Sequence, residues 1–70
     1  MSQFSDSLKT MRKQSDKKQR EVAAYLGINI RTYQNYEGGQ SEPSIPQLIK
    51  LADLFMVSLD ELVGRDWIGL

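Results

Sequence analysis

Apolar residues recur along this chain at intervals of three and four, and polar or glycine-rich segments separate the groups. The first group lies in residues 5–14, where Leu8 and Met11 share one face and Phe4 lies one turn earlier. The second group is a stripe of Val22, Ala23 and Leu26. Gly27 follows this stripe, and glycine favours the left-handed backbone that commonly ends a helix. The spacing therefore predicts two helices before residue 28.

A third helix is predicted over residues 30–37. Asn29 is a favourable N-cap, because its side-chain oxygen accepts a hydrogen bond from a first-turn N–H group. Tyr33 and Tyr36 share one face of this helix, which predicts that both rings pack into the core. The stop is expected at Gly38-Gly39.

Two more helices begin with capping-box patterns, in which two side chains bond each other's backbone N–H groups. Ser44 with Gln47 fits this pattern at the start of the fourth helix, and Ser58 with Glu61 fits it at the start of the fifth, which Gly64 ends. The predicted core-facing residues of the fourth helix are Ile45, Leu48, Leu51, Ala52 and Phe55. No segment alternates polar and apolar residues over a useful length. The chain is therefore predicted to be all-α, a compact five-helix domain.

Length and composition narrow the class. Seventy residues make one small domain, expected to span 1–70 with a core over about 5–64. The chain has no cysteine and no histidine, so no disulfide or zinc site is expected. It also shows no paired carboxylates for an apolar pocket and no Gly-rich phosphate loop, so no enzymatic activity is expected, and no cofactor. No apolar run approaches the roughly 18 residues of a membrane span, and the N-terminus lacks the basic and apolar regions of a signal peptide. The expected location is the cytoplasm.

The formal net charge is zero, but the charges are unevenly distributed. Residues 9–31 hold seven cations and two anions, whereas residues 32–70 hold two cations and six anions. A neutral protein with one basic half can present a basic face to DNA. Scattered solvated charges would have the same composition, so the asymmetry alone leaves both interpretations open.

Residues 19–37 predict a helix-turn-helix, because one helix ends at Gly27 and the next is capped at Asn29. The side of the third helix that the core does not need carries mainly hydrogen-bonding side chains. These residues are Ile30, Arg31, Thr32, Gln34 and Asn35. Arginine pairs bidentately with guanine, and asparagine or glutamine with adenine, in the major groove of DNA. A helix of this length fits that groove.

The run from Gln19 to Gly39 resembles the helix-turn-helix core of the Cro/phage-repressor (XRE-type) family, which has the lambda-repressor-like DNA-binding fold. The run reads QREVAAYLGINIRTYQNYEGG, and residues 43–62 resemble the fourth and fifth helices of that family. The resemblance covers about residues 5–64. It implies a sequence-specific transcriptional regulator that binds duplex DNA with the helix at 30–37 in the major groove.

The resemblance also implies roles for individual residues. The base-reading positions are Ile30, Arg31 and Asn35, with Thr32 and Gln34 beside them. The expected phosphate contacts are Gln19 in one region, and Gly39, Gln40, Ser41 and the start of the fourth helix in a second. Lys18 adds a cation beside Gln19. Gln19 is also expected to brace the third helix. Arg12 and Glu37 match a structural ion pair between the first helix and the end of the third.

Two positions depart from the family pattern. Asp16-Lys17-Lys18 stands where the family has a glycine–apolar–threonine run. A lysine side chain cannot accept a hydrogen bond, so either Asp16 caps the second helix one turn earlier or the start of that helix is frayed. Ile30 cannot donate a hydrogen bond to a base, so it either contacts a thymine methyl group or turns inward and packs.

These features predict a repressor that binds a palindromic operator as a homodimer, because a single helix reads only about four or five base pairs. With no room for a sensor domain, the expected mechanism is steric blocking of a promoter, and the expected location is with the nucleoid. The apolar tail over 65–70 contains Trp67, Ile68 and Leu70. This tail either packs back on the domain or forms a two-fold dimer contact. It also favours the alternative function, a protein-interaction module such as an antitoxin of a toxin–antitoxin pair.

Overall fold

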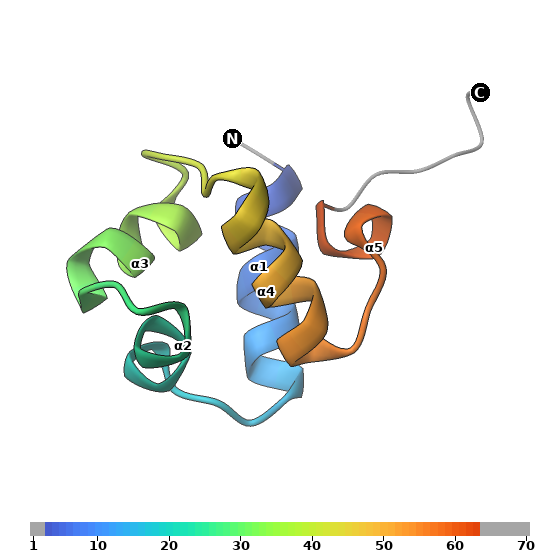
Figure 1. Cartoon of the computed structure of the whole chain (residues 1–70), viewed down its shortest axis with the longest axis horizontal. Helices are drawn as coiled ribbons and strands as arrows, with labels where there is room; N and C mark the ends of the chain where they lie inside the picture. Colours follow the sequence, from blue (N-terminus) through green and yellow to red (C-terminus); the bar gives the residue numbers. More distant parts are fainter. Residues whose placement is uncertain (1–2, 64–70) are drawn as a thin grey trace.

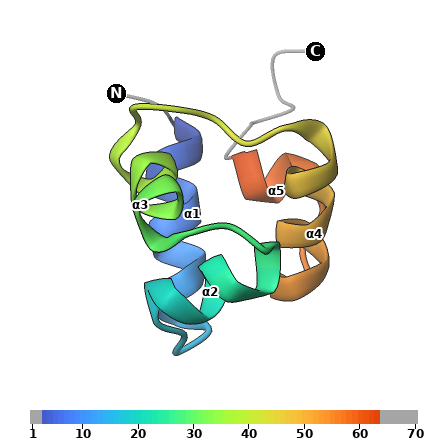
Figure 2. The same ribbon diagram turned by 60° about the vertical axis from the view of Figure 1, so that its left-hand side comes forward.

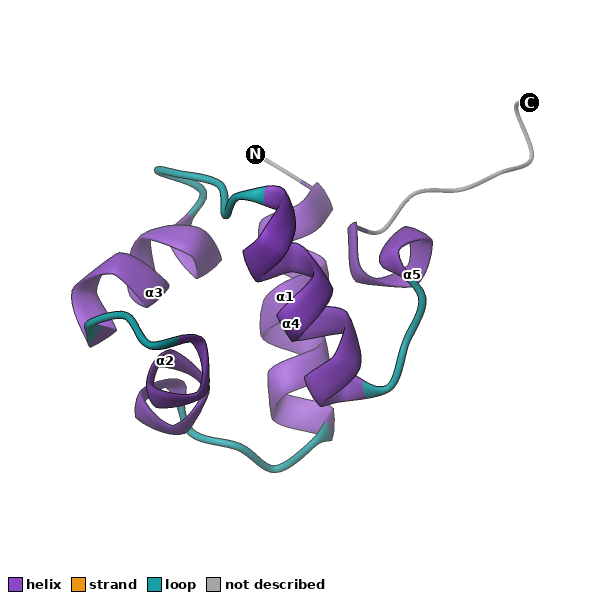
Figure 3. Cartoon of the chain, in the orientation of Figure 1, coloured by secondary structure: helices purple, strands orange, loops and turns teal. Residues whose placement is uncertain are grey.

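The computed structural model of this chain describes residues 3–63, which form five helices and no strand. The helices are α1 (Gln3–Gln14), α2 (Gln19–Leu26), α3 (Ile30–Gly38), α4 (Ile45–Phe55) and α5 (Leu59–Val63). In Figures 1 and 3, α2 and α3 lie on one side of α4, and α5 lies on the other. The prediction of an all-α, five-helix fold is confirmed. Gly64 and the apolar tail with Trp67, Ile68 and Leu70 lie outside the described residues.

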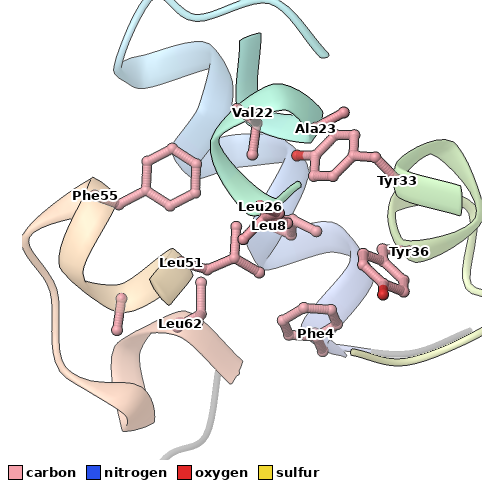
Figure 4. Close-up of a cluster of buried hydrophobic side chains, with 11 residues drawn as sticks. Phe4, Leu8, Val22, Ala23, Leu26, Tyr33, Tyr36, Leu51, Phe55 and Leu62 are labelled. Atoms are coloured by element: carbon pink, nitrogen blue, oxygen red, sulfur yellow. The ribbon is translucent and has the colours of Figure 1, made fainter. Parts of the chain in front are cut away.

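The core takes side chains from all five helices (Figure 4). Its fully buried members include Leu8, Leu51 and Leu62. Tyr33 and Tyr36 are both buried, as predicted, with an edge-to-face geometry and 6.3 Å between ring centroids. Aromatic rings at this separation attract each other in addition to burying apolar area. The two tyrosines therefore anchor α3 to the rest of the fold.

The predicted core face of α4 is wrong at its first residue. Ile45 is 70% exposed, whereas Leu51, Ala52 and Phe55 are buried. Residues three or four apart share a helix face, and Ile45 pairs in this way with Ile49, which is itself 47% exposed. The two isoleucines lie beside the core-facing side of α4 and are not part of it.

The start of α2 differs from both expectations. Asp16 has a φ of 57° and closes the end of α1, where its N–H donates to the Lys13 carbonyl at 3.1 Å. Asp16 therefore does not cap α2. The helix begins at Gln19, and the Lys18 backbone N–H donates to the Glu21 carboxylate at 2.7 Å. A capping box has two hydrogen bonds, and this one uses only the backbone N–H of the cap residue and the side chain three residues later. The start of α2 is therefore not frayed, although the lysine side chain cannot accept a hydrogen bond.

Helix α3 stops at the Gly38-Gly39 pair, as predicted, and it runs one residue beyond the expected end at residue 37. Gly38 is still helical, and Gly39 takes the left-handed conformation with a φ of 82°. A side chain disfavours this backbone conformation, which glycine adopts freely. Gly39 therefore sets the direction in which the chain leaves α3.

The two predicted capping boxes have different outcomes. Ser58 and Glu61 form both hydrogen bonds, at 3.0 and 3.1 Å. At α4, Ser44 Oγ accepts the Gln47 N–H at 3.4 Å, but the Gln47 side chain donates to the Leu26 carbonyl at 3.3 Å. The last carbonyls of a helix lack hydrogen-bond partners within the helix. The Leu26 carbonyl at the end of α2 therefore takes the Gln47 side-chain amide that the capping box would have used. The second half of the box is therefore replaced by a link between α2 and α4.

Candidate nucleic-acid interface

A short turn joins α2 to α3. Gly27 ends α2 with a φ of 74°, and Asn29 caps α3 two residues later. The Asn29 side-chain oxygen accepts the Thr32 N–H at 2.8 Å, as its sequence position predicted. Ala23 is buried, which lets the two helices approach closely. The turn and the cap together set the angle at which α3 leaves α2.

The outer side of α3 carries the five expected base-reading residues, which differ in exposure. Arg31 and Gln34 are exposed, while Thr32 and Asn35 are partly buried. Ile30 is 43% exposed, so it does not turn inward and pack. Ile30, Arg31 and Gln34 are therefore the most solvent-exposed of the five, whereas Thr32 and Asn35 are partly covered by the rest of the domain.

The opposite side of α3 ends in a buried polar network centred on Glu37. Arg12 donates to this carboxylate twice, from Nε to Oε2 at 2.6 Å and from Nη2 to Oε1 at 3.2 Å. The Tyr33 hydroxyl donates to Oε2 at 2.5 Å, and Gln19 Nε2 donates to Oε1 at 3.0 Å. Glu37 is only 5% exposed. The two residues expected to form an ion pair are therefore brought together, with two further donors on the same carboxylate.

The network shifts the ionisation of its members. Burial alone would raise the pKa of the Glu37 carboxyl, but the hydrogen bonds from Arg12, Tyr33 and Gln19 outweigh it and hold that pKa below its usual value. The hydrogen bond with Glu37 raises the pKa of Arg12. Burial, followed by the bond to Glu37, raises the pKa of the Tyr33 hydroxyl. Each group is thus held in the protonation state that the network needs.

Gln19 connects this network to the outer side of α3. Its Nε2 bonds to Glu37, and its Oε1 accepts the Gln34 side-chain N–H at 3.2 Å. The expected bracing contact is therefore present. Two kinds of donor remain available to a phosphate: the second N–H of the Gln19 side-chain amide, and the free backbone N–H groups in the first turn of α2.

Sequence reasoning missed two members of this network. Tyr33 was assigned to the core alone, although it stands four residues before Glu37 and therefore on the same face of α3. Gln34 was assigned to DNA alone, and its bond to Gln19 spans the helix-turn-helix, a distance that local spacing does not report. The tyrosine could have been found from the i, i+4 spacing; the glutamine could not.

The α1–α2 junction presents cations. Arg12 Nη1 donates to the Lys17 carbonyl at 3.0 Å and so holds the junction against α1. Lys18 and Arg20 are exposed, and within residues 3–63 their side chains form no ion pair. A free cation beside unpaired N–H groups at a helix N-terminus is a suitable environment for an anion.

The α3–α4 loop, the second expected phosphate region, directs its backbone N–H groups toward α3. Gly39 N–H donates to the Tyr36 carbonyl at 3.4 Å. Gln40 and Ser41 both donate to the Asn35 carbonyl, at 3.0 and 3.4 Å. The next residue is an exposed glutamate. Of the three residues expected to contact phosphate here, Gln40 and Ser41 still have side chains to offer, whereas Gly39 has none.

No cluster of three or more acidic, histidine or cysteine side chains is placed to hold a metal ion within residues 3–63. No helix in the same range is long and apolar enough to cross a membrane.

Comparison with known proteins places the chain among regulators. A family model described as helix-turn-helix matches residues 8–62. The cryptic phage CTXphi transcriptional repressor RstR of Vibrio cholerae is 38% identical over 60 residues, which are 86% of this chain and 54% of that protein. The HTH-type transcriptional regulator AnsR of Bacillus subtilis is 43% identical over 61 residues, 87% of this chain and 53% of that protein.

A solved structure has the same architecture. The crystal structure of a transcriptional regulator from Listeria innocua superimposes with a TM-score of 0.87 at 36% identity, covering 94% of this chain and 62% of that one. The chain spans about half the length of the two regulators from Vibrio cholerae and Bacillus subtilis. The similarity therefore concerns their helix-turn-helix part.

Proposed function

The chain belongs to the XRE-type helix-turn-helix family, and on this premise we propose that it binds duplex DNA sequence-specifically as a homodimer and represses transcription. One observation carries the proposal. The buried network around Glu37 fixes α3 against α1 and α2 and leaves Ile30, Arg31 and Gln34 exposed on its outer side. A rigid helix with a polar outer side is what major-groove recognition requires.

Each of the five candidate base-reading side chains on α3 has a base partner of matching chemistry. Arg31 is suited to a guanine, through two N–H donors in a plane. Asn35 and Gln34 are suited to adenine, and Thr32 to a base or a phosphate. Ile30, which is exposed, is suited to a thymine methyl group.

Phosphate contacts would position α3 without reading sequence. We assign them mainly to the α1–α2 junction, through Lys18 and the first turn of α2 with Gln19. The side chains of Gln40 and Ser41 would add weaker contacts on the other flank. This unequal assignment follows from the charges of the two flanks, because Lys18 is exposed at the junction and Glu42 is exposed beside Gln40 and Ser41 in the loop.

Two copies on a palindrome would supply the specificity that one helix lacks, with half-sites about 10 base pairs apart. Repression would follow from steric blocking of a promoter. A repressive role is supported by the similar protein RstR, which is named a transcriptional repressor. Such a protein would associate with the nucleoid in the cytoplasm.

The test is a binding selection from random duplex DNA at about 150 mM salt, followed by sequencing. We expect an enriched palindrome, and we expect the Arg31→Ala variant to lose preference at one base position of each half-site, at a cost of about 1–3 kcal/mol. Weak, salt-sensitive binding with no enrichment would contradict the proposal. A stoichiometric protein partner in place of an enriched sequence would favour the interaction-module alternative.

A further inference from the structure

Both oxygens of the buried Glu37 carboxylate are fully occupied by donors. Oε1 accepts from Arg12 and Gln19, and Oε2 accepts from Arg12 and Tyr33. In Figure 2, α3 lies in front of α1 and beside α2, and side chains from all three helices meet at this carboxylate. An ionised carboxylate has about four acceptor sites and no donor. Every neighbour of Glu37 therefore has to present a donor to it.

This requirement fixes the orientation of the Gln19 side-chain amide. A glutamine amide has a donor end, Nε2, and an acceptor end, Oε1. Gln19 Nε2 lies 3.0 Å from Glu37 Oε1, so turning the amide over would place two acceptor oxygens against each other. Such a contact is unfavourable at a buried carboxylate, which would also lose one of its donors. Gln19 therefore directs its Oε1 away from Glu37.

Gln34 receives its orientation from Gln19 in turn. The Gln19 oxygen can only accept, and Gln34 Nε2 donates to it at 3.2 Å. Gln34 is exposed on the outer side of α3. One of its two N–H groups is committed to Gln19. Within the described residues, its Oε1 and its second N–H are left for a ligand.

We propose that Glu37, acting through Gln19, sets the base preference of Gln34, so that Gln34 reads a base by accepting a hydrogen bond. This inference rests on the proposed function and deepens it by naming the bases. In the major groove, adenine and cytosine offer an amino N–H donor, whereas guanine offers N7 and O6 and thymine offers O4, which are acceptors. Gln34 therefore selects adenine or cytosine at one position of each half-site. Its second N–H can also donate to N7 of adenine, which favours adenine over cytosine.

A glutamine without this support would select bases less strictly. A free side-chain amide can turn over and present its donors to guanine or thymine instead. The bonds from Glu37 to Gln19 and from Gln19 to Gln34 remove that choice before DNA binds. Glu37 is only 5% exposed, so it acts on the base through the two glutamines and is a positioning residue.

Four duplexes that differ only at the base pair read by Gln34 test the proposal. Selection from random DNA identifies this pair as the one at which Gln34→Ala loses its preference. We expect the wild type to bind the duplexes with adenine or cytosine at least about tenfold more tightly than those with guanine or thymine. A wild-type preference for guanine or thymine, or a Gln34→Ala variant that loses no preference, would overturn the inference.

Two substitutions of Gln34 show which end of its amide contacts the base. Gln34→Glu presents acceptors only, so it should keep the preference for adenine or cytosine, although its charge lowers affinity for every duplex. Gln34→Lys presents donors only and should reverse the preference toward guanine or thymine. Loss of the preference in Gln34→Glu would show that the glutamine reads with its N–H groups, contrary to the inference.

Two substitutions away from the base test the positioning role. Glu37→Gln introduces an amide that can also donate, so Gln19 and Gln34 can both turn over. The tenfold preference should fall to about twofold, while the other positions keep theirs. Gln19→Met breaks the same connection and leaves the Arg12–Glu37 pair in place, so it gives a second test if Glu37→Gln folds poorly. An unchanged preference in Gln19→Met would reject the positioning role.

Lys18→Ala is the matched control for Gln19→Met. Both variants remove a proposed phosphate contact at the start of α2, so both should lower affinity for all four duplexes. The ratio between the duplexes should change only in Gln19→Met. An equal change of this ratio in Lys18→Ala would show that phosphate contacts alone control the preference, and would overturn the inference.

NMR spectra of the side-chain amides give a readout in the free protein. We expect one Gln34 amide proton to exchange with water several-fold more slowly than those of the exposed Gln14. Gln19→Met should remove this protection. If no sequence is selected from random DNA, the proposed function fails, and these spectra still decide whether the Gln34 amide is held. If a sequence is selected but the wild-type Gln34 amide exchanges like that of Gln14, the inference fails alone.

Discussion

The two flanks of the recognition helix were expected to do the same work, but they are built differently. Both flanks return three successive N–H groups to the preceding helix: those of Ser15, Asp16 and Lys17 to α1, and those of Gly39, Gln40 and Ser41 to α3. The junction adds side-chain support, because Arg12 donates to the Lys17 carbonyl and Glu21 accepts the Lys18 N–H. It also keeps the exposed cation Lys18 and the free N–H groups at the start of α2. The loop is followed by the exposed Glu42, and the first turn of α4 contains Pro46, which has no N–H.

The difference shows that a segment's place beside a recognition helix does not determine what it can bind. Phosphate binding needs donors that are not otherwise paired. The junction leaves the Lys18 side chain and the first-turn N–H groups of α2 for this purpose, whereas the N–H groups of Gly39, Gln40 and Ser41 in the loop are bonded to α3. The predictions below remove one type of support at a time.

The largest effect is expected from Arg12→Met, which removes the side-chain brace of the junction. It leaves the buried Glu37 carboxylate without its ion-pair partner, and breaking a buried pair in this way costs about 3–5 kcal/mol of unfolding free energy. Urea unfolding at pH 7 measures this loss. Adding Glu37→Met to the same protein should cost less than the two single changes together, because the two residues interact. Additive losses would mean that the pair contributes little.

Acid should weaken the same support. The folded-state pKa of Glu37 lies below its unfolded value, so its contribution to stability is present above about pH 4.3 and is lost as the pH falls through the folded-state pKa. Glu37→Gln cannot ionise and lacks this contribution. The gap in unfolding free energy between the wild type and Glu37→Gln should therefore narrow below about pH 4.3. A gap that stays constant down to pH 3 would show that the carboxylate is not the source.

How much of these two flanks was predictable depends on the range of each interaction. The Asn29 cap and the Ser58–Glu61 box are local, and their spacing alone predicted them correctly. The Gln47 amide had the same local pattern, but a carbonyl 21 residues away took it. The spacing of residues within one helix cannot predict a hydrogen bond to a carbonyl in another helix.

The candidate site shows the same limit. The proximity of Arg12 and Glu37 was expected only through the resemblance to a family, because 25 residues separate them. The orientation of the loop N–H groups depends on the left-handed turn at Gly39; the sequence predicted a stop at Gly38-Gly39 but not which of the two glycines takes that conformation. Ile45 was misplaced because its helix is apolar on two sides, and periodicity does not say which side the core takes.

A matched pair of glycine variants tests the backbone support of the loop. Gly39→Ala forces a side chain onto a left-handed residue and should cost about 1–2 kcal/mol of unfolding free energy. The space there is adequate, since the nearest atom to the new Cβ is Ser5 Oγ at 3.7 Å. Gly38 is helical, and a Cβ added there would contact only the movable end of the Gln40 side chain. Gly38→Ala should therefore leave the free energy of unfolding nearly unchanged. Equal effects of the two changes would mean that the left-handed turn is not what holds the loop.

The smallest effect is expected on the salt dependence of DNA binding. This measurement tests directly whether the α1–α2 junction contributes more to phosphate binding than the α3–α4 loop does. Lys18→Ala removes a free cation beside the start of α2, and we expect it to flatten the slope of log affinity against log salt by about one unit for every bound copy. Gln40→Ala removes an uncharged side chain from the loop, so it should leave that slope unchanged and lower affinity by less than tenfold. Fluorescence anisotropy with the selected duplex over a range of salt concentrations measures both. If the slope stays the same without Lys18, this cation does not contact phosphate, and the junction holds α3 without contributing charge to the complex.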